Sequence, residues 1–139
     1  MCGMNAVRSP IAEAEARAML PGRIFIASAG VRAGQRDAFV DAVLEEDGLS
    51  IADHAPRTLR DLEDSYFDLI ITLSPEAHHA ALELTRTMAV EVEYWATADP
   101  TGTTGTRDQI LAAYRDVRDR LKARISVRFN GKPVENERD

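Results

Sequence analysis

Cys2-Gly3-Met4-Asn5-Ala6-Val7-Arg8-Ser9-Pro10 stands at the start of the chain and has the pattern C-x5-R-S. Five residues between a thiol and a guanidinium suit a loop whose successive backbone N–H groups turn inward around an anion. The helix expected after this loop points its positive N-terminal end at the same place. Such surroundings favour the nucleophilic thiolate of a cysteine, and the planar guanidinium of Arg8 can hold two phosphate oxygens. The stretch therefore predicts a phosphoryl-transfer site.

The helix that follows the loop is marked by its first residues. Ser9 is a plausible N-cap and Pro10 a favourable first helical residue. We expect this helix over residues 10–20, and Pro21-Gly22 to end it.

The rest of the chain alternates apolar runs with helical patterns. The apolar runs predict strands at residues 23–27, 67–73 and 90–97. The helical patterns predict helices at residues 36–47, 75–87 and 107–124, with Gly48 as one stop signal and Ser74-Pro75 as one start signal. This alternation indicates an α/β fold, with a parallel sheet covered by helices on both faces. We expect one domain over residues 1–125 and a polar tail over 126–139.

The loop resembles that of the low-molecular-weight protein tyrosine phosphatase family. Asn5 and Ser9 stand where this family has its loop Asn and the Ser after the Arg. Asp99-Pro100 resembles the general-acid loop of the family, and the segment from Asp68 to Ile71 resembles its Asp-x-Ile strand.

Two further segments carry the resemblance. Ser28-Ala29-Gly30 resembles the family's Ser-Ala-Gly/Ala-Thr, although Val31 replaces the Thr, and His54 and Arg57 match its His-x-x-Arg segment. The resemblance covers residues 2–124 with every piece in order.

The resemblance implies the three-layer α/β fold of these phosphatases and a catalytic set. Cys2 would be the nucleophile, Arg8 would stabilise the transition-state oxygens, and Asp99 would be the general acid. The phosphate-binding loop would consist of Gly3, Met4, Asn5, Ala6, Val7, Arg8 and Ser9. The supporting residues around it would be Asn5, Ser9, Ser28 and His54.

The chain departs from the family before Cys2, where the family has an apolar central strand and this sequence has only Met1. The first strand is therefore missing or truncated. Three interpretations are open: the natural chain starts upstream, another segment such as residues 126–129 or a partner chain fills the gap, or the protein is an inactive relic. We favour the first, because the catalytic set is intact.

Composition and charge limit the partners. The chain has 139 residues, a net charge of −6 and a single Cys. Negative charge argues against nucleic acid or an anionic membrane as the main partner, whereas a phosphorylated protein or a small phosphomonoester would be held locally. No run is long enough to span a bilayer, and a lone Cys gives no sign of secretion, so we expect a cytoplasmic protein.

Other charged and polar residues are assigned no catalytic role. His78 and His79 are adjacent on a helix, point to different faces and have no further ligand, so we expect no metal and no cofactor. The charged residues of the last helix are interpreted as a solvated face; they are Arg115, Asp116, Arg118, Asp119, Arg120, Lys122 and Arg124.

Two other functions are weighed beside the phosphatase. A thiol-dependent arsenate reductase shares this fold, but it needs further cysteines, and Val7 stands where a second loop Cys often lies. A phosphate-binding or interaction protein without catalysis is the other. Thr101-Gly102-Thr103 follows Asp99-Pro100 where the family usually has tyrosines, and Arg32 lies in the second rim loop, which favours a smaller or more anionic substrate.

Overall fold

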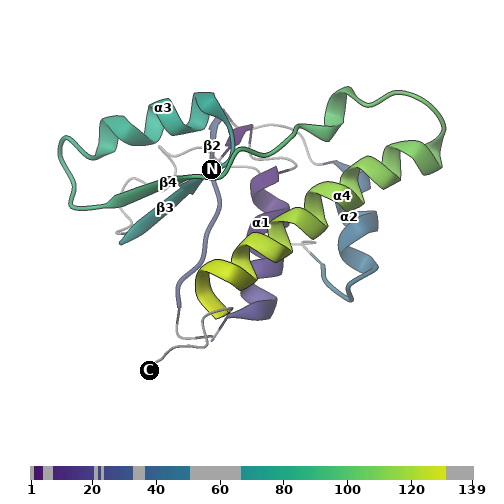
Figure 1. Cartoon of the computed structure of the whole chain (residues 1–139), viewed down its shortest axis with the longest axis horizontal. Helices are drawn as coiled ribbons and strands as arrows, with labels where there is room; N and C mark the ends of the chain where they lie inside the picture. Colours follow the sequence, from purple (N-terminus) through teal and green to yellow (C-terminus); the bar gives the residue numbers. More distant parts are fainter. Residues whose placement is uncertain are drawn as a thin grey trace.

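The structure is a computed structural model that describes residues 2–4, 8–20, 22, 24–32, 37–50 and 67–130. Its elements are, in order, β1 (Cys2–Met4), α1 (Arg8–Met19), β2 (Gly30–Arg32), α2 (Ala38–Glu45), β3 (Leu69–Thr72), α3 (Pro75–Leu84), β4 (Glu91–Tyr94), a 3-10 turn (Pro100–Gly102), α4 (Arg107–Ile125) and a π-helical turn (Ser126–Asn130). The bundle of α1, α2 and α4 lies on one side of the molecule, and α3 lies apart from it (Figure 1).

All the strand pairs are parallel, which confirms the predicted α/β class. β1 pairs with β2, with Cys2 opposite Gly30, and β3 pairs with β4, with Leu69 opposite Glu91. Among the described residues these are two separate two-stranded sheets. Between these two pairs of strands, no hydrogen-bonded ladder is present in the part of the chain that the structure describes.

The prediction of a strand at residues 23–27 is wrong for its described part. Residues 24–29 form no ladder, and β2 begins only at Gly30. A strand needs a neighbour to take its backbone hydrogen bonds, and β1 starts opposite Gly30. Instead, Arg17 Nη2 donates to the carbonyl oxygen of Ile26 over 2.6 Å.

The ends of the helices partly follow the predicted signals. Ser74 caps α3 by accepting a 3.2 Å hydrogen bond from the Ala77 N–H, and Pro75 is its first residue. Gly48 has a φ of 75° after α2, a conformation that suits glycine. The predicted cap at Ser9 is wrong, because α1 already begins at Arg8, and the buried Ser9 hydroxyl donates to the Ala29 carbonyl over 3.5 Å.

The core lies where α1, α2 and α4 meet, beside the ends of β3 and β4. Its largest contributors are fully or almost fully buried, and they come from all three helices and from the segments after both strands. They are Ile11, Val40, Val43, Leu44, Leu73, Trp95, Leu111, Tyr114, Val117, Leu121 and Ile125. Burial of each large aliphatic side chain stabilises the fold by about 1.5–3 kcal/mol.

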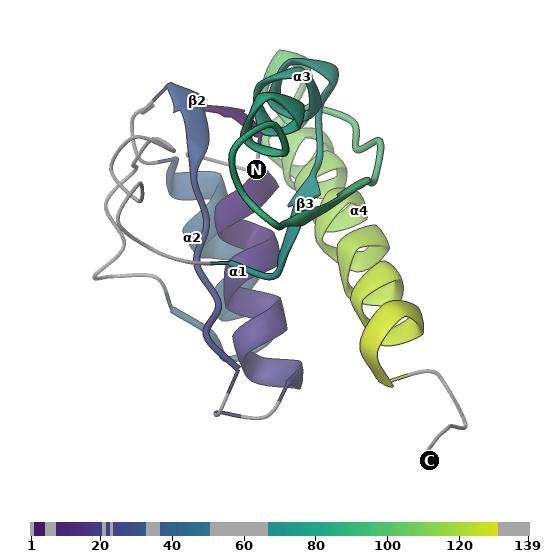
Figure 2. The same cartoon turned by 90° about the vertical axis from the view of Figure 1, so that its left-hand side faces the viewer.

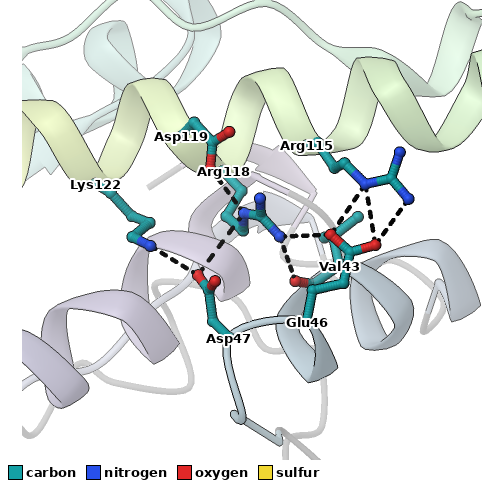
Figure 3. A network of polar contacts seen from close by, with 7 residues as sticks. All are labelled: Val43, Glu46, Asp47, Arg115, Arg118, Asp119 and Lys122. Atoms are coloured by element: carbon teal, nitrogen blue, oxygen red, sulfur yellow. Dashed lines mark hydrogen bonds and ion pairs between the residues drawn. The ribbon is translucent and has the colours of Figure 1, made fainter.

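The predicted solvated face of α4 is wrong at Arg118, which is only 8% exposed. Its guanidinium donates to the Val43 carbonyl oxygen and to Glu46, each over 2.8 Å, and Figure 3 shows it between α4 and α2. Arg115 and Lys122, one turn away on either side, pair with Glu46 and Asp47. A charge can be buried here because carboxylates and a carbonyl surround it.

Residues 126–130 continue the helical backbone past the predicted domain boundary, as a π-helical turn. The interpretation that residues 126–129 supply a strand is therefore wrong. Phe129 packs against the core from this turn.

Candidate functional site

The backbone of Cys2 lies at the start of β1, opposite Gly30. Since β1 and β2 are parallel, Cys2 and Gly30 begin their strands side by side. Asn5, Ala6 and Val7, and His54 of the expected support, lie outside the described residues.

Arg8 is the first residue of α1 and turns toward the segment after β4. Its Nη1 donates to the Thr97 carbonyl oxygen over 3.0 Å, and its Nη2 lies 3.9 Å from Asp99 Oδ2. The Arg8 side chain is 14% exposed and that of Asp99 is 50% exposed. The structure thus brings together two of the three predicted catalytic residues from distant parts of the sequence.

Asp99 is held by the turn that follows it. Its Oδ1 accepts hydrogen bonds from the Thr101 N–H over 3.0 Å and from the Thr101 hydroxyl over 2.8 Å, so it caps the 3-10 turn. Partial burial raises the pKa of Asp99, but the two bonds from Thr101 and the charge of Arg8 outweigh it and hold the pKa below its usual value. At neutral pH Asp99 is therefore a carboxylate, and it faces the guanidinium of Arg8.

A second polar group lies beside α1. The Ser28 hydroxyl donates to Glu13 Oε1 over 2.5 Å, and Glu13 Oε2 pairs with Arg17 Nη2 over 3.1 Å. Ser28 is buried, so this bond satisfies its hydroxyl. Its predicted role in supporting the loop stays a prediction, because residues 5–7 are not described.

Sequence reasoning missed Thr97, Thr101 and Glu13. Thr97 acts through a backbone carbonyl, which no side-chain pattern reveals. Thr101 had a usable signal, because an Asp side chain often accepts a hydrogen bond from the residue two positions later in a capping turn.

Tyr114 connects α4 to this region. Its hydroxyl donates to Asp37 Oδ2 over 2.6 Å, and its ring lies 5.2 Å from that of Phe39. Burial, the bond to Asp37 and the negative charge of Asp99 all raise the pKa of Tyr114. The Tyr114 phenol therefore stays protonated beside the site.

The part of the chain that the structure describes holds no group of three or more His, Cys, Asp or Glu arranged for a metal ion. None of its helices is long and apolar enough to cross a membrane.

The described residues thus show an α/β fold of parallel strand pairs in which the Arg of the C-x5-R pattern, Arg8, faces Asp99 from beyond the last strand. The profile of the low molecular weight phosphotyrosine protein phosphatase family matches residues 1–129, and the chain belongs to this family.

Its relatives include enzymes of two kinds. A tyrosine phosphatase of Erwinia amylovora, AmsI, is 25% identical and superposes with a TM-score of 0.75 over 94% of this chain and 88% of its own. An arsenate reductase of Archaeoglobus fulgidus is 31% identical, with a TM-score of 0.60 over 90% of this chain and 95% of its own. A glutaredoxin arsenate reductase of Synechocystis is 26% identical over 90% of this chain and 89% of its own.

Proposed function

We propose that this protein is a phosphatase that hydrolyses phosphomonoesters of the phosphotyrosine type through a cysteinyl-phosphate intermediate. The observation that carries the proposal is the convergence of Arg8, at the start of α1, on Asp99 and the Thr97 carbonyl. A guanidinium at a helix N-terminus binds a phosphoryl group, and a carboxylic acid 3.9 Å away is within reach of its leaving oxygen.

In the first step the Cys2 thiolate attacks phosphorus. The S–P bond forms while the bond to the leaving oxygen breaks, and Asp99 gives its proton to that oxygen. Arg8 holds the equatorial oxygens as negative charge spreads over them.

In the second step water attacks phosphorus and breaks the S–P bond. Asp99, now a carboxylate, takes the proton of this water, so that inorganic phosphate and the Cys2 thiolate are released.

The binding of a phosphate monoester also explains how Asp99 becomes an acid. In the unliganded site the charge of Arg8 helps to lower the pKa of Asp99. A phosphate dianion neutralises that guanidinium and adds negative charge nearby, and both effects raise the pKa of the carboxyl group. Substrate binding therefore favours the protonated form of Asp99, which is the form that the first step uses.

The experiment is hydrolysis of p-nitrophenyl phosphate, with orthovanadate as inhibitor. We expect vanadate-sensitive turnover that Cys2→Ser abolishes and Asp99→Asn lowers by about 10²-fold or more. Asp116→Asn is the matched control, because Asp116 is an exposed aspartate paired with Arg120 on α4. Wild-type protein that binds phosphate without turnover would instead support the inactive phosphate-binding protein.

The arsenate reductases among the relatives favour a second candidate. Reduction of arsenate to arsenite takes two electrons, which two thiols supply as they become a disulfide. This chain has one Cys, so Cys2 would provide one thiol and an external thiol such as glutathione the other. Arsenite formation that depends on both Cys2 and glutathione would establish this activity.

A further inference from the structure

A buried pair of carboxyl groups lies where α1, α2 and α4 meet. Glu15 of α1 is 2% exposed, and its carboxyl group donates a hydrogen bond to Asp47, which follows α2. Glu15 Oε2 is buried and has no hydrogen-bond partner in the part of the chain that the structure describes. A negative charge on that oxygen would have no donor to stabilise it, so the geometry favours a protonated Glu15.

The charges around Glu15 balance one another without it. They form the polar network between α2 and α4 that Figure 3 shows. Its acids are Glu46, Asp47 and Asp119, and the cations that pair with them are Arg115, Arg118 and Lys122.

An ionised Glu15 would add a further negative charge to this network, directly beside Asp47. Lys122 and Arg118 would attract that charge. Burial and the contact with Asp47 nevertheless outweigh this attraction, and they raise the pKa of Glu15 to about 7. The pair therefore holds one proton in the core and loses it near neutral pH.

The same face of α1 carries Glu15 and Arg8. Arg8, Ile11 and Glu15 stand at positions i, i+3 and i+7 of the helix, a spacing that places them on one face. Ile11 lies between the other two and is fully buried in the core. In Figure 2, α1 has α2 on one side and α4 on the other. Seven residues of helix span about 10 Å, so α1 is a short, rigid link between the carboxyl pair and the guanidinium.

We propose that the Glu15–Asp47 pair is a pH switch for the position of Arg8. While the pair holds its proton, the carboxyl hydrogen bond keeps α1 against α2 and α4. When the proton passes to water, two carboxylates face each other in the core, α1 shifts away from Asp47, and Arg8 leaves its place beside Thr97. The site then binds a dianion less tightly. This inference rests on the proposed role of Arg8 in binding a phosphoryl group.

The first experiment tests the switch without any substrate. Amide hydrogen exchange is measured at pH 6 and at pH 8 and corrected for the intrinsic rates. We expect the protection of residues 12–19 of α1 to fall at pH 8 by about fivefold more than that of residues 75–84, because α3 lies apart from the three helices (Figure 1).

Two variants accompany this measurement. Glu15→Gln keeps a neutral side chain at both pH values and should remove the extra loss of protection in α1. Glu83→Gln, at an exposed position of α3, is the matched control and should keep it. An equal loss in the wild-type protein and in Glu15→Gln would overturn the switch.

A variant of the partner tests the pair itself. In Asp47→Asn, Glu15 faces an amide instead of a second carboxylate, so its ionisation should no longer push α1 away. The extra loss of protection at pH 8 should disappear, as in Glu15→Gln. Asp119→Asn is the control, because Asp119 also pairs with Arg118 but is exposed. A loss that persists in Asp47→Asn would overturn the role of the pair.

The second experiment tests the link to Arg8 with sulfate, which stays a dianion between pH 6 and pH 8. Calorimetry should show the Kd for sulfate rising over this range by about fivefold more in the wild-type protein than in Glu15→Gln. The comparison cancels the titration of other groups near the site, because both proteins contain them. An equal rise in both proteins would overturn the link. Sulfate binding that Arg8→Ala leaves unchanged, or no sulfate binding at either pH, would contradict the proposed function itself and the link with it.

Discussion

The guanidinium of Arg8 donates a 3.0 Å hydrogen bond to the carbonyl oxygen of Thr97, two residues before Asp99. This bond attaches the start of α1 to the segment that follows β4. The helix α1 follows the β1–β2 pair, whereas the segment with Thr97 follows the β3–β4 pair. It fixes the guanidinium through one nitrogen and leaves the other facing the carboxylate of Asp99.

Arg8→Lys is expected to lower kcat/KM for p-nitrophenyl phosphate by about 10²–10³-fold, because an ammonium cannot bind two phosphoryl oxygens in one plane. Steady-state kinetics measure the effect, and thermal unfolding checks that the fold is kept. Arg86→Lys is the control, since Arg86 forms an exposed pair with Glu83 on α3. Equal losses in both variants would contradict the role of Arg8.

Thr101→Val removes the 2.8 Å hydroxyl hydrogen bond to Asp99 and keeps the one from the backbone. The hydroxyl stabilises the carboxylate, so its loss raises the pKa of Asp99. Because the first step of the proposed mechanism needs protonated Asp99, the alkaline limb of the kcat–pH profile should move to higher pH. Thr104→Val, on the exposed loop before α4, should leave the limb in place; an unmoved limb in Thr101→Val would argue against Asp99 as the acid.

Glu15 is 2% exposed and faces Asp47, Arg118 and Lys122 where α1, α2 and α4 meet. Burial, and then the hydrogen bond and charge of Asp47, raise the pKa of Glu15 to about 7. Between its unfolded value of 4.5 and 7, the folded state binds more protons than the unfolded chain, so this group lowers stability as pH rises.

We therefore expect Glu15 to make the protein roughly 2 kcal/mol less stable at pH 8 than at pH 5. Glu15→Gln should remove this loss, because its amide stays neutral at both values. Urea unfolding at the two pH values measures it. Glu83→Gln, at an exposed position of α3, is the control and should keep the wild-type dependence.

Leu121→Ala is expected to destabilise the fold by about 2–5 kcal/mol, because Leu121 is 1% exposed in the core and its removal leaves a cavity. Leu82→Ala, at a 44% exposed position of α3, should cost about 0.5 kcal/mol or less. Urea unfolding compares the two. Similar losses would mean that the core is not where α1 and α4 meet.

The sequence predicted those parts of the fold that depend on local signals. Ser74-Pro75 and Gly48 marked helix ends correctly, because caps and positive φ values depend on neighbouring backbone. Residues 24–27 failed as a strand because a ladder depends on what lies beside it, and apolar composition does not report that. Arg118 failed as a surface residue because its partners Val43 and Glu46 come from another helix.

In the proposed site, too, the features that depend on local sequence were predicted and those that depend on tertiary packing were not. The sequence alone predicted a site from the spacing of Cys2 and Arg8 and from the Asp99-Pro100 pair. The 3.9 Å approach of Arg8 to Asp99 was not, because it depends on the packing of α1 against the segment after β4. Gly3 and Met4, which were predicted in the loop, lie in β1. The roles of Asn5, Ala6, Val7 and His54 remain predictions.

The separation of β1–β2 from β3–β4 has a consequence for how this enzyme would vary. Cys2 belongs to the first pair of strands and Asp99 follows the second, so the distance from the proposed nucleophile to the proposed acid is set by the packing of α1 on α4. Conservative exchanges in that helix interface, remote from any substrate, would then change kcat while leaving substrate affinity intact. Natural selection for reaction rate would then also act on the hydrophobic core residues between α1 and α4.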